Sequence, residues 1–200
     1  MPVLNFFGNH TLDFKNSDFD ELQNYVISQL GNIDIPKDIL LMELDSLRLH
    51  FSGADLSKFV DIENWCPFSF PDPIGEHNLP HRNIALIGKM GMNLVFTPKH
   101  IRLPGGNYQP LEWYSPHNKE KVQAWRDFYY KIISQFGGDH ALYVDDQKTS
   151  TYYDPMEDAS LHKFEQALEE RYGPPESMIS LSHGEYLEYY IDTFADLKAP

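Results

Sequence analysis

The stretch FGGDHALYVDDQKTSTYYDP, Phe136 to Pro155, passes from one kind of structure to another twice. Gly137 marks the end of a helix, because glycine is the common residue just past a helix C-terminus. The run from His140 to Val144 is typical of a short strand, and a loop rich in acids and tyrosines follows it. This order predicts a helix, a strand and an exposed loop, around which the remaining elements can be placed.

Helices are concentrated in the C-terminal half. The first extends from a cap at Ser115 to Phe136, and its apolar stripe is Val122, Trp125, Tyr129, Ile132, Ile133 and Phe136. A second is predicted from Ser160 to Tyr172, before Gly173. A third begins at Ser182, with Glu185 as its capping partner, and continues with Leu187, Tyr190, Ile191 and Phe194.

The first half contains one clear helix and several strands. The helix has Ser17 or Asp18 as its cap, with Asp20 or Glu21 three residues on as the capping partner, and it ends at Gly31. Residues 2–7 and 11–14 flank Gly8-Asn9 and predict a first hairpin, whereas residues 83–87 and 93–97 predict a second. Further strands are expected in the second half of residues 36–52 and at residues 101–103, with a turn at 104–107.

These elements predict an α+β fold in a single domain, residues 1–200, with an antiparallel or mixed sheet and about four helices. The segment Cys66 to Pro80 holds four prolines and is predicted to be a long loop, because proline lacks a backbone donor. A hydrophobic share of 42% is enough for a packed core.

Charge narrows the classes of partner. The chain has 30 acidic and 16 basic residues, which gives a formal net charge of -14. Nucleic acid is therefore not expected as a partner, whereas a basic protein would be attracted. Cys66 is the single cysteine, so no internal disulfide can form. With no apolar run long enough to cross a membrane and no signal segment, we expect a cytoplasmic protein without a membrane partner.

No catalytic motif stands out, and no cofactor or catalytic residue is predicted. The sequence lacks a G-x-S-x-G elbow and a phosphate-binding glycine loop. A metal site at Glu76, His77 and His81 is a weaker alternative, because Pro80 opposes the helix that would align the two histidines.

The acidic loop is the predicted partner-binding surface. Its residues are Asp145, Asp146, Tyr152, Tyr153, Asp154, Glu157 and Asp158. Tyrosine offers rigid contact area and carboxylates attract lysine and arginine, so the combination suits a basic protein. The alternative is a solvated connection in which Asp158 or Ser160 caps the next helix.

Residues 113–198 resemble a group of uncharacterised bacterial proteins of the toxin-immunity type. The resemblance is carried by the tryptophan-centred helix, the run FGGDHALYVDD and the later helix that ends in ERYGPP. It implies a protein that neutralises a toxin by direct binding, and it assigns a role to no single residue. The expected function is therefore that of a non-enzymatic acidic immunity protein. The alternatives are a metal-dependent hydrolase and a scaffold protein.

Overall fold

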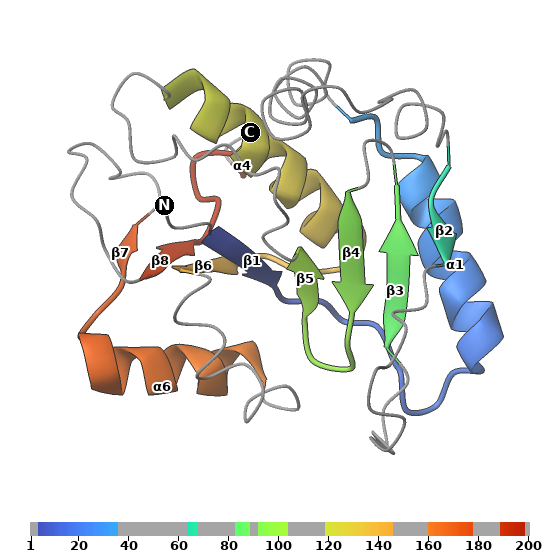
Figure 1. Ribbon diagram of the computed structural model, residues 1–200, viewed down its shortest axis with the longest axis horizontal. Helices are drawn as coiled ribbons and strands as arrows, with labels where there is room; N and C mark the ends of the chain where they lie inside the picture. Colours follow the sequence, from blue (N-terminus) through green and yellow to red (C-terminus); the bar gives the residue numbers. More distant parts are fainter. Residues whose placement is uncertain are drawn as a thin grey trace, which may run out of the picture.

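The computed structural model describes residues 4–35, 64–67, 83–88, 92–103, 119–145, 160–177 and 189–198. Within these ranges, eight strands form one sheet in the order β2-β3-β4-β5-β1-β6-β8-β7 (Figure 1). The strands are β1 (Leu4–Gly8), β2 (Cys66–Pro67), β3 (Ile84–Ile87), β4 (Asn93–Phe96), β5 (Ile101–Leu103), β6 (Ala141–Asp145), β7 (Glu176–Ser177) and β8 (Tyr189–Asp192). Every pairing is antiparallel except that of β7 with β8, so the sheet is mixed.

Helices cover both faces of this sheet. The described helices are α1 (Phe19–Gly31), α4 (Lys119–Gln135) and α6 (Leu161–Tyr172). Helices α1 and α4 contribute to one hydrophobic cluster, and α6 contributes to another. Along β1 the side chains alternate, so Phe6 enters the first cluster and Phe7 the second. The protein is therefore an α+β fold with a core on each side of the sheet.

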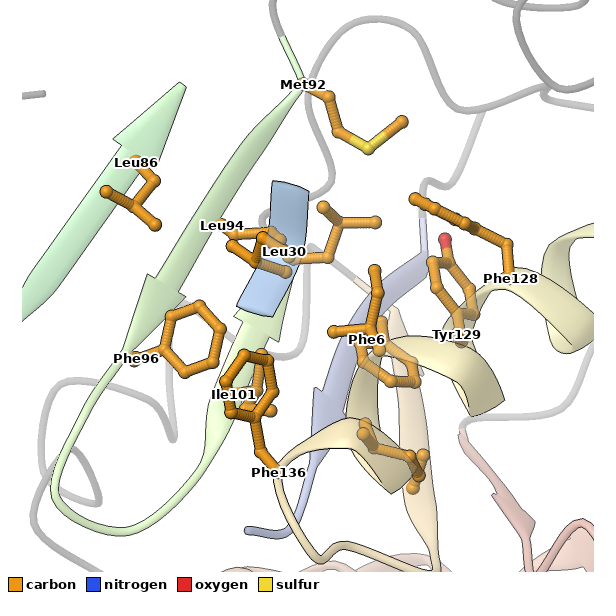
Figure 2. Packing of buried hydrophobic residues seen from close by; sticks show 14 of the residues in the cluster. Phe6, Leu30, Leu86, Met92, Leu94, Phe96, Ile101, Phe128, Tyr129 and Phe136 are labelled. Atoms are coloured by element: carbon orange, nitrogen blue, oxygen red, sulfur yellow. The ribbon is translucent and has the colours of Figure 1, made fainter. Parts of the chain in front are cut away.

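The larger core lies between the sheet and helices α1 and α4. Figure 2 shows Leu94, Phe96 and Ile101 from the strands facing Leu30 of α1 and residues of α4. Within this layer, Phe6 stacks on Tyr129 with ring centroids 4.2 Å apart. Such aromatic pairs contribute about 0.5–1.5 kcal/mol beyond the area that they bury.

Local sequence explains where these helices begin and end. Asp18, rather than Ser17, caps α1, since its carboxylate accepts the backbone N–H groups of Asp20 and Glu21. Ser160 caps α6 in the same way, since its hydroxyl accepts the backbone N–H of Lys163. After α4, Gly137 adopts a φ of 76°, which glycine tolerates without strain.

The predicted first hairpin is wrong. β1 is central and pairs with β5 and β6, whereas residues 11–14 form no strand. The backbone donors that follow Gly8 are already used: the Thr11 N–H binds the Phe136 carbonyl, and the Leu12 N–H binds the ring of His10. The predicted hairpin at residues 83–97 is confirmed as β3 paired with β4.

The predicted last helix is wrong where the structure describes it. Residues 189–192 form β8, with Tyr189 in the core on the α6 side and Tyr190 in the core on the opposite side. Burial on alternate faces has the period of a strand and satisfies both cores at once. Ser182 and Glu185 lie outside the described residues, and three helices are described where about four were expected.

The predicted loop at Cys66 to Pro80 is wrong at its start, because Cys66–Pro67 forms β2 and pairs with β3. Pro67 can occupy this place because β2 is an edge strand, where a missing donor breaks no ladder. The predictions for residues 36–52, for the turn at 104–107 and for the cap at Ser115 fall outside the described residues.

Candidate functional site: an acidic helix face and two polar clusters

The structure places only the first residue of the predicted binding loop. Asp145 ends β6, where it pairs with Leu4 of β1. The other loop residues, Asp146, Tyr152, Tyr153, Asp154, Glu157 and Asp158, lie outside the described ranges. The loop connects a central strand to the Ser160 cap of α6. The alternative metal residues Glu76, His77 and His81 also lie outside the described residues.

Helix α1 presents an acidic face that the sequence reading overlooked. Asp20 and Glu21 occupy its first turn, and the helix contains no lysine or arginine. Tyr25 is 48% exposed and is the one large hydrophobic side chain that is exposed among the described residues. Because Glu21 and Tyr25 are four residues apart, they are neighbours on the helix surface. The face combines carboxylates with an exposed aromatic ring, as the predicted loop does in sequence.

The buried polar cluster around Arg126 joins α4 to the C-terminal segment. Arg126 Nε donates to Asp192 Oδ2 at 2.6 Å, and both of its terminal nitrogens donate to the carboxylate of Asp196 at 2.7 and 2.9 Å. The remaining contacts are to Asp192 Oδ1 at 3.0 Å and to Gln123 Oε1 at 2.8 Å. All five donors of the guanidinium are therefore used.

The Arg126 cluster has the properties of a structural ion pair. Burial lowers the pKa of Arg126, but the hydrogen bonds to Asp192 and Asp196 outweigh it and raise the pKa above its ordinary value. The same contact with Arg126 lowers the pKa of Asp196. Asp192 also accepts the backbone N–H of Phe194, whose φ is 51°. A guanidinium with every donor occupied holds structure in place and has none left for a ligand.

A second polar cluster explains the run FGGDH. Asn9 Oδ1 accepts the backbone N–H groups of Asp139 and His140, and its Nδ2 donates to Asp139 Oδ1 at 2.8 Å. Gly138 packs against this residue so closely that a Cβ would overlap the carbonyl oxygen of Asn9. Gly137 thus ends α4, and the lack of a side chain at Gly138 allows the backbone to lie close to Asn9.

The same cluster contains an aspartate-histidine pair near the surface. Asp139 Oδ1 lies 3.0 Å from His140 Nδ1, and Lys198 Nζ donates to the Asp139 carbonyl at 2.8 Å. The hydrogen bond from His140, followed by that from Asn9, lowers the pKa of Asp139. Asp139 thus holds the ring of His140 at Nδ1, and Asn9 holds its backbone N–H.

Within the described ranges, no three or more His, Cys, Asp or Glu side chains come close enough to hold a metal ion. None of the described helices is long and apolar enough to cross a membrane. The chemistry that these ranges offer is charge and hydrogen bonding at the surface. The acidic face of α1 was overlooked in sequence because its acids were assigned to helix capping. The four-residue spacing of Glu21 and Tyr25, which lie beside the buried stripe of the helix, could have revealed it.

No family model, no curated protein and no solved structure matches this chain.

Proposed function

We propose that this chain is a non-enzymatic acidic binding protein, of the toxin-immunity type, that neutralises a basic protein by covering its active site. The observation that carries the proposal is the outer face of α1, where Tyr25 is exposed beside Glu21 and the helix has no basic residue. An aromatic ring supplies contact area, and the neighbouring carboxylates supply attraction to lysine and arginine. The resemblance of residues 113–198 to immunity-type proteins supports the same class.

Electrostatics elsewhere in the structure agree with this proposal. The formal net charge of -14 attracts a basic partner over distances of about 8–10 Å at physiological salt. On the α6 side, burial and then the charges of Glu169 and Glu165 raise the pKa of Tyr189 to about 12. The carboxylates of Glu165 and Glu169 on α6 are therefore close enough to act on Tyr189 of β8.

The loop that begins at Asp145 remains part of the proposal. Asp146, Asp154, Glu157 and Asp158 would pair with the cations that a nuclease-like toxin uses for phosphate, and Tyr152 and Tyr153 would anchor the contact. The acidic face of α1 and this loop are two separate candidate surfaces, so an experiment has to distinguish them.

The test begins with a tagged chain used to capture its partner from native lysate at low salt, with mass spectrometry and metal analysis of the same sample. Association kinetics are then measured with the purified partner at several salt concentrations. Three variants are compared: Asp20→Asn with Glu21→Gln on α1, Asp145→Asn with Asp146→Asn at the loop, and Glu169→Gln with Glu170→Gln on α6. Each variant removes the same charge from a different surface.

The variant on the contact surface should slow association and flatten its salt dependence more than the other two, since steering depends on charges that face the partner. We expect this for α1 or for the loop, and the α6 variant is the control. Equal effects of all three would remove the assignment to either surface. A partner bound independently of salt, or bound metal without a partner, would reject the proposed function itself.

A further inference from the structure

The segment Asn9 to Leu12, which follows β1, is tied to two loops at one end of the sheet; in Figure 1 it is the blue coil that leads from β1 toward α1. On one side, the Asn9 N–H binds the carbonyl of His140 at 3.2 Å and the Thr11 N–H binds that of Phe136 at 2.9 Å. On the other side, the ring of His10 contacts the turn between β4 and β5. The segment therefore bridges the α4–β6 loop and the β4–β5 turn.

The geometry around His10 determines which ring nitrogen carries its proton. The backbone N–H of Leu12 donates to His10 Nδ1 at 3.0 Å, so Nδ1 must be the unprotonated nitrogen. The other nitrogen, Nε2, lies 2.8 Å from the carbonyl oxygen of Thr97 and has to donate to it. The neutral ring thus satisfies both neighbours at once. A second proton, on Nδ1, would point at the N–H of Leu12, and two donors would face each other.

We propose that residues 9–12 form a pH-sensitive strap, in which protonation of His10 releases Leu12 and loosens the segment while the sheet stays folded. The Thr97 carbonyl is a fixed partner for Nε2, because the Thr97 N–H and hydroxyl both donate to the carbonyl of His100 and close the β4–β5 turn. Protonation of His10 therefore breaks the hydrogen bond from Leu12 at Nδ1 and leaves the hydrogen bond to Thr97 at Nε2 in place. This inference is independent of the proposed partner.

The charged groups described near His10 do not offset the effect of protonating its ring. Burial lowers the pKa of His10, and the hydrogen bond to Thr97 opposes this in part. The charged and titratable groups on the elements that meet at the strap are Asp13, Lys15, Lys99, His100, Asp139, His140 and Lys198. The carboxylate of Asp13 accepts N–H groups of its own turn, and that of Asp139 is held by Asn9 and His140. No ion pair joins His10 to any of them in the described part of the chain.

The direction of the pH effect follows from linkage. A histidine whose pKa is lower in the folded strap favours the strap above the unfolded value of 6.5. The stabilisation is lost as pH falls through the lower, folded value. The strap should therefore be closed at neutral pH and open in mildly acidic solution.

The test is amide hydrogen exchange of the full chain by NMR, at neutral pH and one unit below the midpoint of the His10 ring titration. After correction for intrinsic exchange, the Leu12 amide should lose about tenfold or more of its protection, as expected when a partly buried N–H loses its acceptor. Amides of β6 should keep theirs. His10→Asn is the matched variant, since an asparagine oxygen accepts the N–H two residues on without titrating.

In His10→Asn, the protection of Leu12 should stay constant between the two pH values. Either of two results would overturn the proposal. One is protection of Leu12 that does not change with pH in the unmodified chain. The other is a loss that occurs equally in His10→Asn, or only together with the β6 amides, because then His10 is not the cause or the strap does not open by itself.

Discussion

At the scale of single residues, the carboxylate of Asp192 is fully buried and is paired with Arg126. Arg126→Met should cost about 3–5 kcal/mol of unfolding free energy, because removing one partner leaves an uncompensated buried charge. Urea unfolding at neutral pH measures this cost. The double variant with Asp192→Asn is the control and should recover part of the loss, as it removes the orphaned charge. A cost below about 1 kcal/mol for the single variant would show that solvent reaches Asp192.

Tyr189 gives a prediction at alkaline pH. Its hydroxyl donates to the Gly173 carbonyl at 2.6 Å, and burial, with Glu169 and Glu165, raises its pKa to about 12. A raised pKa means that the unfolded chain ionises first, so the stability that Tyr189 contributes is complete below pH 10 and is lost as pH rises toward 12. Tyr189→Phe should cost about 1 kcal/mol at neutral pH and should make the alkaline decline shallower. Urea unfolding over this pH range checks both the cost at neutral pH and the alkaline decline. If the decline were unchanged in Tyr189→Phe, other tyrosines would be its cause.

At the scale of elements, the passage from α4 into β6 depends on a close approach of two backbones. In Gly138→Ala the new Cβ would overlap the Asn9 carbonyl oxygen, so the loop has to shift, at a cost of about 1–3 kcal/mol. Gly31→Ala is the matched control, since nothing lies within 4 Å of the Cβ that alanine would add. Replacing a helical glycine by alanine stabilises the helix by up to about 1 kcal/mol. Thermal unfolding should therefore shift in opposite directions for the two variants. Equal shifts would mean that the loop accommodates a side chain.

The elements that could be predicted from sequence are those determined by local signals. Helix α6, with Ser160 and Gly173 at its ends, and the pairing of β3 with β4 are of this kind. β8 was predicted as a helix because its apolar residues fit either period. Its strand form is stabilised by contacts from distant parts of the chain, such as Arg126 with Asp192. The position of β1 at the centre of the sheet also depends on distant partners, β5 and β6.

The candidate surfaces likewise divide into one that local sequence reveals and features that depend on distant parts of the chain. The acidic loop from Asp145 could be proposed from composition alone, because charge and tyrosine content are visible in any sequence. The exposure of Tyr25 on α1 required the helix to be placed against the sheet. The clusters of Asn9 with Asp139 and of His10 with Thr97 join residues that no local pattern relates.

At the scale of the whole molecule, the formal net charge of -14 opposes the compact state, because folding brings like charges together. Among the described residues, the ion pair of Arg126 with Asp192 is buried on both sides, so it is screened much less than charges at the surface. Adding sodium chloride should therefore weaken repulsion more than attraction, and thermal unfolding in increasing salt at neutral pH should show a rising midpoint. The rise should level off once the screening length falls to about 8–10 Å, near physiological salt.

A chain with two fewer negative charges is the control for this effect. Replacing Asp20 and Glu21 of α1 by Asn and Gln removes two negative charges at the surface and leaves the Arg126 cluster intact. The increase of its unfolding midpoint with salt should be smaller than that of the unmodified chain, because less repulsion is left to screen. The comparison uses the dependence on salt and not the midpoint in low salt, because acids in the first turn of a helix also stabilise it by about 0.3–1 kcal/mol each. A midpoint that falls with salt in both chains would mean that surface attraction outweighs repulsion, despite the excess of acids.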